Sequence, residues 1–159
     1  YLGYVAVPQL QETDYIFPIE GKGSDDVFSG YGRRSNPFLR GKFQFHYGLD
    51  ILARNRKDEV IASKSGRIIY AGWNGGYGNC VIIEHVGGET TIYGHLSYIY
   101  FKRGTYAKRG SVIAISGNTG TSTGPHVHFE IRNKNNIPIN PINKLWPNDL
   151  TNHITYNYN

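Results

Sequence analysis

Apolar and polar residues alternate along most of the chain in short runs that glycine-rich turns separate. Such alternation places every second side chain on the same face of a strand, and turns of this kind join neighbouring strands. Gly87 and Gly88 form a tight hairpin turn between two runs, and residues 133–136 join the last run to a short stretch at 137–139. The pattern predicts strands at 59–62, 67–72, 80–86, 89–93, 111–116 and 127–132.

Signals for helices are nearly absent. Residues 96–101 and 143–146 could each form a single helical turn, but neither has a sustained 3.6-residue period. We therefore predict a mostly β, single-domain fold: an antiparallel sheet or barrel-like structure with long loops lining a cleft.

The length of 159 residues suits one domain. Composition divides the chain into an N-terminal linker or entry segment at 1–35, a main domain at 36–146, and a polar C-terminal tail at 147–159. The basic pair Arg33 and Arg34 falls in the loop-like part of the first segment, where we expect both side chains to be solvated.

The run that ends the main domain carries titratable side chains on one face. Its three apolar residues between 127 and 131 alternate with His126, His128 and Glu130. Two histidines so spaced lie about 6.5–7 Å apart, which suits one as a metal ligand and the other as a base. Spacing does not say which is which, and two surface histidines fit it too. Glu130 is either a partner for a ligand's second ring nitrogen or an exposed strand-end carboxylate.

A second pair, His46 and Asp50, has a His-x-x-x-Asp spacing. On an extended strand the two side chains would lie about 13 Å apart, too far for one ion. Gly48 between them favours a bend that brings both to one ion, although a surface pair or a hydrogen-bonded loop carboxylate would give the same spacing.

Two imidazoles and one carboxylate form the three-ligand set of hydrolytic zinc sites, which leave a coordination position for water. A spare histidine beside such a set could act as general acid and base. His95 qualifies, because the pattern places it at a strand end on the face of Thr91 and Tyr93; a surface imidazole is the alternative. We expect His85 to mark a strand edge and His153 to lie in the polar tail without a chemical role.

Other chemistries find less support. Cys80 begins an apolar strand and is expected to be a small core residue rather than a nucleophile. The chain has no Gly-x-Ser-x-Gly motif, and its glycine-rich loop at 117–124 lacks the Gly-Lys-Ser/Thr of a phosphate-binding loop. No motif organises the thirteen tyrosines into a nucleic-acid surface.

Composition and charge limit the partners and the cellular locations that the chain suits. The net charge of +5 and the pI near 9.3 suit an anionic partner such as an acidic cell-wall polymer, or serve solubility alone. A single cysteine excludes an intrachain disulfide, and no apolar run approaches the about 18 residues that span a bilayer. Because the chain begins at Tyr1 and lacks methionine, we expect a processed or excised piece without signal peptide or anchor.

Four motifs, in this order along residues 32–145, resemble the lysostaphin-type (LytM-like) zinc metallopeptidases that cut peptidoglycan cross-bridges. They are His46-x-Gly48-x-Asp50, Gly76-Tyr77-Gly78-Asn79-x-Val81-x-Ile83-x-His85, Tyr93-x-His95-Leu96-Ser97, and Gly117-x-Thr119-Gly120-x-Ser122-Thr123-Gly124-Pro125-His126-x-His128-Phe129-Glu130. By this resemblance His46, Asp50 and His128 bind one Zn2+, His95 and His126 are the catalytic histidines, and 36–146 is the peptidase domain.

The resemblance implies a zinc endopeptidase that hydrolyses amide bonds in the peptide part of bacterial peptidoglycan, in the cell envelope or secreted. We expect its cleft to be lined by the turn at 74–78, the segment after His95 and the loop at 117–124. The alternative is a non-catalytic peptidoglycan-binding or amidase-activating module on the same fold, which the intact ligand set disfavours. The sequence leaves open which cross-link is cut, a glycine bridge or a D-amino-acid linkage, and what the oligomeric state is.

Overall fold

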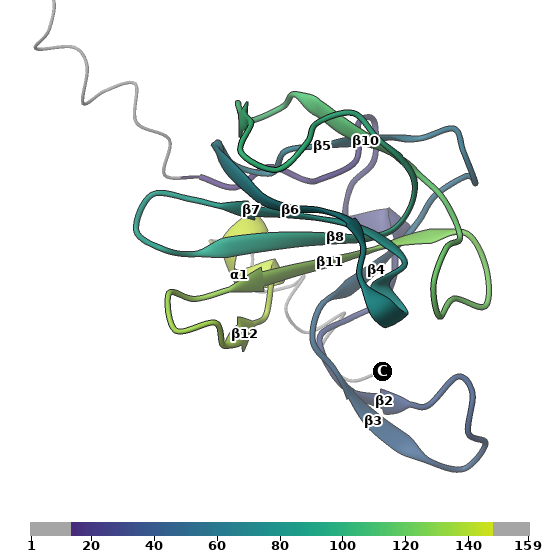
Figure 1. Cartoon of the computed structure of the whole chain (residues 1–159). Coiled ribbons are helices and arrows are strands. Elements are labelled where there is room, and N and C mark those ends of the chain that lie inside the picture. Colours follow the sequence, from purple (N-terminus) through teal and green to yellow (C-terminus); the bar gives the residue numbers. More distant parts are fainter. Residues whose placement is uncertain (1–13, 148–159) are drawn as a thin grey trace, which may run out of the picture.

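A computed structural model of the chain describes residues 14–147 (Figure 1). Strands dominate this part of the chain, and helices are limited to three single turns. The elements are η2 (Ser24–Asp26), β1 (Val27–Ser29), β2 (Gly32–Ser35), β3 (Phe43–His46), β4 (Leu49–Leu52), β5 (Glu59–Ile61), β6 (Gly66–Trp73), η3 (Gly75–Tyr77), β7 (Asn79–Glu84), β8 (Thr90–Ile99), β9 (Tyr106–Ala107), β10 (Val112–Ser116), β11 (His126–Arg132), β12 (Pro138–Ile139) and α1 (Ile142–Leu145).

Ten strands form one antiparallel sheet, and β2 and β3 form a separate hairpin. The main path of the sheet runs β1-β4-β11-β8-β7-β6-β9. In addition, β10 pairs with both β5 and β8, and β12 pairs with β11. Figure 1 shows the β2–β3 hairpin projecting beyond the body of the sheet. The mostly β, antiparallel fold expected from the alternation is confirmed.

The hydrophobic core covers one face of the central strands. Val127, Phe129 and Ile131 of β11 are fully buried in it, together with Tyr93 of the neighbouring β8. Because side chains alternate along a strand, the polar residues of β11 point to the opposite face. The core thus fixes the strand that carries the histidines while leaving their face free for chemistry.

The predicted strands agree with the observed ones to within one or two residues, except that β8 continues to Ile99, six residues beyond its predicted end at 93, and the possible helical turn at 96–101 is not formed. Residues 96–99 continue β8, where cross-strand pairing with β10 overrides the weak local signal. The other turn exists as α1. Within residues 14–147, no helix has the length and apolar character needed to cross a membrane.

Part of the N-terminal segment packs onto the sheet. Tyr15, Ile19 and Val27 belong to the core, and β1 pairs with β4. Residues 1–13, and all of the predicted tail except Pro147, lie outside the described residues, and His153 lies there too. The domain boundaries at 35 and 146 stay a prediction.

Candidate metal centre and active site

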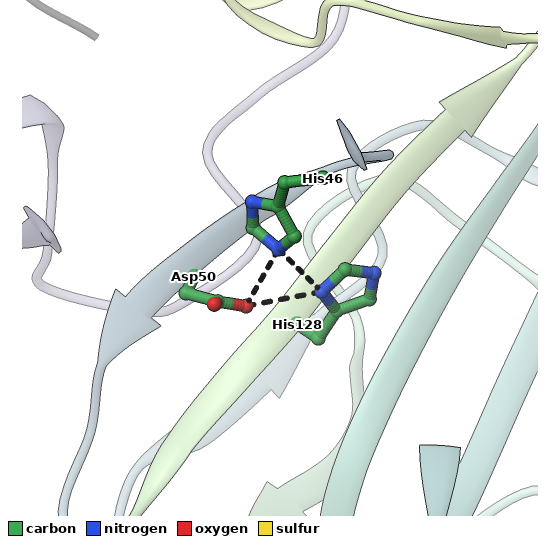
Figure 2. A group of neighbouring side chains, drawn as sticks. All are labelled: His46, Asp50 and His128. Carbon is green, nitrogen blue, oxygen red and sulfur yellow. Dashed lines mark hydrogen bonds and ion pairs between the residues drawn. The ribbon is translucent and has the colours of Figure 1, made fainter. Parts of the chain in front are cut away.

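Three side chains from three strands meet at one point above the polar face of the sheet (Figure 2). His46 Nε2 lies 3.2 Å from Asp50 Oδ1 and 3.2 Å from His128 Nδ1, and the last two atoms are 3.0 Å apart. All three residues are buried, with 4%, 4% and 9% of their surface exposed. The bend expected at Gly48 therefore brings together the three side chains that were candidate metal ligands, which spacing alone could not show.

Strand pairing accounts for this convergence. Asp50 of β4 lies directly opposite His128 of β11, so both side chains emerge on the same face. The chain turns between β3 and β4 at Gly48, where a side chain would have no room. A Cβ atom there would lie 2.2 Å from the carbonyl oxygen of Phe129 and 2.8 Å from Glu130 Cγ.

Gly48→Ala is therefore expected to push β4 away from β11. We expect a loss of about 1–3 kcal/mol in the free energy of unfolding, the usual cost of overpacking, together with weaker zinc binding. Urea denaturation monitored by fluorescence measures the first effect. Gly23→Ala is the matched control, since a Cβ there meets nothing within 4 Å; equal stability of the two variants would contradict the close approach.

The hydrogen bonds of the two imidazoles leave the right nitrogens free for a metal. His46 Nδ1 lies 2.8 Å from the carbonyl oxygen of Gly30, which can only accept, so Nδ1 carries the proton and Nε2 keeps its lone pair. His128 Nε2 lies 2.8 Å from a carboxylate oxygen of Glu130, which leaves the lone pair on Nδ1. Two nitrogen lone pairs and a carboxylate oxygen facing each other fit a bound cation.

The charges at the site point the same way. Burial disfavours a charged imidazole at His128, but the adjacent carboxylates of Asp50 and Glu130 outweigh burial and raise its pKa to about 9. Burial likewise opposes an ionised Asp50, yet its close contacts with the rings of His126, His128 and His46 outweigh burial and hold its pKa far below the usual range. The arrangement stabilises positive charge between its ligand atoms, which a divalent cation would supply.

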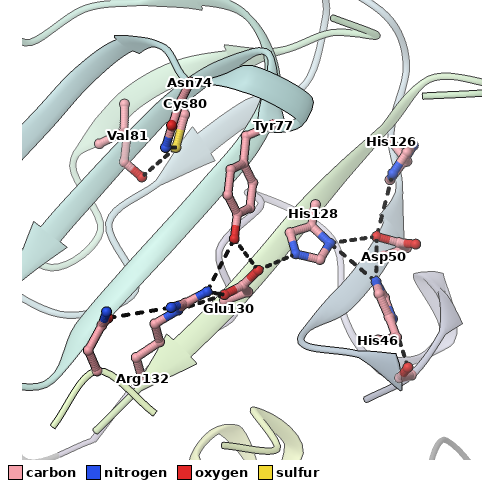
Figure 3. A network of polar contacts seen from close by, with 12 residues as sticks. His46, Asp50, Asn74, Tyr77, Cys80, Val81, His126, His128, Glu130 and Arg132 are labelled. Carbon is pink, nitrogen blue, oxygen red and sulfur yellow. Dashed lines mark hydrogen bonds and ion pairs between the residues drawn. The ribbon is translucent and has the colours of Figure 1, made fainter. Parts of the chain in front are cut away.

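His126 stands beside this group. Its Nδ1 lies 2.8 Å from the carbonyl oxygen of Gly124 and 3.1 Å from Ser122 Oγ, so the carbonyl fixes the proton on Nδ1. Its Nε2 lies 3.4 Å from Asp50 Oδ1. Figure 3 shows the two side chains facing each other. His126 thus presents a proton-accepting nitrogen to the site.

His95 reaches the site through an irregularity in β8. Between Tyr93 and Leu96 the register against β7 shifts by one residue, which is a β-bulge. His95 lies in this bulge with a φ of 61°, a left-handed conformation that costs a residue with a side chain about 1–3 kcal/mol. The expectation that His95 shares a face with Tyr93 is wrong, because Tyr93 is buried in the core while the bulge turns His95 to the polar face.

The bulge directs the His95 ring toward His126, with the ring centroids 4.6 Å apart. His95 Nδ1 lies 2.7 Å from the carbonyl oxygen of Thr119, so its proton is on Nδ1 as well. Burial, and then the neighbouring His126, lower the pKa of His95 to about 4. Both histidines therefore offer Nε2 to the site as an acceptor.

A groove of about 390 Å³ lies over the side chains of Asp50, His126 and His128. A second hollow, of about 430 Å³, adjoins it, and His95 and His128 line both. The loop at 121–125 and the turn residues Gly76 and Tyr77 line the two, as expected for loops carried on a rigid sheet. The β2–β3 hairpin, rather than the segment after His95, supplies the opposite wall.

The hairpin also contributes a residue that the sequence analysis misjudged. Arg34 is not solvated: its side chain is 17% exposed, and its Nη1 lies 2.6 Å from Asp50 Oδ2 and 2.9 Å from Ser29 Oγ. The ion pair occupies the carboxylate oxygen that faces away from the ligand atoms of His46 and His128. Arg34 thereby orients Asp50, a role that the loop-like composition around it did not indicate.

His85 directly follows the last residue of β7, so it does mark the end of a strand, and it is buried there. It is 3% exposed and hydrogen-bonded through both ring nitrogens, to the carbonyl oxygen of Ser65 and to Thr91 Oγ1, at distances of 2.8 Å and 2.9 Å. It has a structural role outside the groove.

The model of the peptidase M23 family matches residues 44–141. The chain belongs to peptidase family M23. Its curated relatives include the DD-carboxypeptidase/endopeptidase Mpg of Neisseria meningitidis serogroup B, 40% identical over 131 residues, and the peptidoglycan DD-endopeptidase ShyB of Vibrio cholerae, 34% identical over 126 residues. These alignments cover 82% and 79% of this M23 chain but only 30% and 29% of the relatives, so the chain spans less than a third of their length.

Solved structures agree with the assignment. A zinc containing peptidase from Vibrio cholerae superposes with a TM-score of 0.71 at 32% identity, covering 81% of this M23 chain and 39% of that structure. The catalytic domain of lysostaphin from Staphylococcus simulans gives a TM-score of 0.68 at 33% identity, covering 77% and 94%. The resemblance to lysostaphin-type peptidases is confirmed.

Proposed function

We propose that this chain is a zinc-dependent endopeptidase that hydrolyses amide bonds in the peptide cross-links of bacterial peptidoglycan. The observation that carries the proposal is the convergence of His46, Asp50 and His128 at the floor of a groove, with the free nitrogens of His95 and His126 beside them. The activities named for its M23 relatives support peptidoglycan as the substrate.

In this proposal His46 Nε2, Asp50 Oδ1 and His128 Nδ1 hold the zinc. When bound there, zinc would polarise the scissile carbonyl and make a water molecule more acidic. Three protein ligands leave a position open for substrate or water, as hydrolytic sites require. Arg34 keeps the Asp50 carboxylate turned toward the imidazoles through its outer oxygen.

The two remaining histidines handle protons. We assign His126 Nε2 to the removal of a proton from the attacking water, because its Nδ1 is already committed to the Gly124 carbonyl. We assign His95, once its Nε2 has taken up a proton, to the support of the developing oxyanion or to the delivery of that proton to the leaving amine. Backbone carbonyls fix both rings, so neither needs to reorient during the reaction.

Digestion of purified sacculi tests the proposal. The zinc-loaded protein should release new amine ends, lose this activity with a chelator and regain it when zinc is restored. Mass analysis of the released muropeptides identifies the bond that is cut. A protein that binds zinc and sacculi but releases no amine ends would instead be the non-catalytic binding module.

The positive net charge predicts that binding to the bacterial cell wall depends on the salt concentration. The net charge of +5 favours an anionic polymer, and interactions between exposed charges weaken when salt shortens the Debye length from about 10 Å at 0.1 M to about 3 Å at 1 M. We expect the fraction of protein that sediments with sacculi to fall over this range. Equal sedimentation at both salt concentrations would contradict an electrostatic contribution.

The proposed substrate also sets the location. Peptidoglycan lies outside the cytoplasmic membrane, so we propose that the protein acts in the cell envelope or after secretion.

A further inference from the structure

The metal ligand His128 is held from behind by a buried carboxylate. Glu130, two residues along β11, is 1% exposed, and its Oε2 accepts a hydrogen bond of 2.8 Å from His128 Nε2. Glu130 is therefore not an exposed strand-end carboxylate. Figure 3 shows it on the far side of the imidazole from Asp50, so that the ring is held between two carboxylates.

Glu130 is itself fixed by two further side chains. Its Oε2 also accepts a hydrogen bond of 2.6 Å from the hydroxyl of Tyr77, and its Oε1 accepts bonds of 2.9 Å and 2.8 Å from Arg132 Nε and Nη2. Arg132 Nη2 lies 3.3 Å from the Tyr77 hydroxyl oxygen, which closes the network. Arg132 compensates the buried negative charge, and both carboxylate oxygens are occupied.

This arrangement decides which nitrogen of His128 can bind metal. Ionised Glu130 is an acceptor only, so the ring proton must reside on Nε2 and the lone pair on Nδ1, which faces His46 and Asp50. A carboxylate behind a ligating imidazole also makes the other nitrogen a better electron donor.

The network reaches the wall of the groove. Tyr77 belongs to η3 and lines the groove, and its ring centroid lies 5.7 Å from that of His128. Gly94, which pairs with His128 across the strands, leaves the space for this ring: a Cβ there would lie 3.1 Å from Tyr77 Cδ1. The turn that borders the groove is thus tied to the metal ligand through one hydroxyl group.

We infer that Glu130, braced by Arg132 and Tyr77, is the positioning residue that fixes the tautomer and orientation of His128 for metal binding. The inference rests on the proposed zinc site. It makes Tyr77 a groove residue whose hydroxyl contributes to metal affinity without touching the metal.

A second carboxylate in the same chain provides a matched control. Glu89 also accepts a hydrogen bond from a tyrosine hydroxyl, that of Tyr15, and also pairs with a cation, Lys144 Nζ at 3.2 Å. It lies in the turn between β7 and β8 and lines neither hollow of the groove. Glu130→Gln and Glu89→Gln therefore remove similar charges, but only the first acts on a proposed metal ligand.

Zinc affinity, measured by competition with a chromogenic chelator, tests the inference on the whole chain. Glu130→Gln should weaken zinc binding by about 10- to 100-fold, the usual effect of losing such a partner, while Glu89→Gln leaves it unchanged. In nitrogen-15-labelled, zinc-loaded protein, the hydrogen-bonded Nε2 proton of His128 should shift upfield or exchange faster in Glu130→Gln only.

A second pair of variants, with a smaller expected effect, tests the inference if Glu130→Gln fails to fold. Tyr77→Phe removes one hydrogen bond to Glu130 and should weaken zinc binding by about 3- to 10-fold, because the acceptor is charged. Tyr93→Phe is its control, since the Tyr93 hydroxyl is buried on the core face and accepts from the Ser63 backbone amide.

The outcomes are distinguishable. If the parent protein binds no zinc, the proposed function fails. If the parent binds zinc and both Glu130→Gln and Tyr77→Phe bind it as tightly as their controls, the inference is wrong while the zinc site stands.

Discussion

His126→Ala is expected to lower kcat by about 10²- to 10⁴-fold while one zinc per chain stays bound, the range that loss of a general acid or base produces. The reason is geometric. His126 Nε2 approaches Asp50 Oδ1 to only 3.4 Å, and its ring is held by Gly124 rather than by the three ligand side chains. Its loss removes a proton acceptor and leaves the ligand set intact. Rates on a defined cross-linked muropeptide, with zinc measured by mass spectrometry, check both parts.

His95→Ala should behave in the same way, and His85→Gln is the control. His85 is a buried histidine hydrogen-bonded to Ser65 and Thr91, outside the groove, so its replacement should alter stability rather than the turnover of folded protein. Loss of zinc from His126→Ala would show that His126, and not His128, is the ligand.

Asp50→Ala is expected to remove both zinc and hydrolysis. Asp50 supplies the only carboxylate oxygen in the proposed ligand set, and its other oxygen forms the ion pair with Arg34. Removing one partner of a buried ion pair costs about 3–5 kcal/mol, and we expect about 3 kcal/mol here because the Arg34 side chain is 17% exposed. Zinc content, turnover and urea denaturation should therefore all change together.

Asp58→Ala is the control that distinguishes the loss of a metal ligand from the loss of a buried ion pair. Asp58 is a buried carboxylate that also pairs with an arginine, Arg54 Nη2 at 2.7 Å, but among residues 14–147 it belongs to no group of side chains that could hold a metal. We expect this variant to lose stability and to keep its zinc. If Asp50→Ala also kept its zinc, Asp50 would not be a ligand.

The alternation of apolar and polar residues predicts those features of the fold that depend on residues close together in the sequence. Alternation along β11 predicts His126 and His128 on the polar face, and the structure agrees: the alternating residues Val127, Phe129 and Ile131 are fully buried in the core. The bend at Gly48 follows from a distance argument, since an extended chain would separate His46 from Asp50.

Other parts of the site depend on contacts that no single segment encodes. His95 enters the site through a left-handed residue in a bulge, a conformation that nothing in its sequence signals. The sequence around Arg34 indicates a solvated loop residue. Only the folded β2–β3 hairpin brings its side chain against Asp50. The buried role of Glu130 becomes evident only when Tyr77, 53 residues earlier in the chain, lies against it.

His46, Asp50 and His128 are proposed to hold one zinc ion. Anomalous diffraction from a zinc-loaded crystal, recorded at the zinc absorption edge, locates the ion among the five candidate side chains. We expect a single strong peak at about 2.0–2.2 Å from His46 Nε2, Asp50 Oδ1 and His128 Nδ1, with no ligand bond to His126 or His95. A peak bonded to His126 in place of His128, or no peak in the groove, would contradict this assignment.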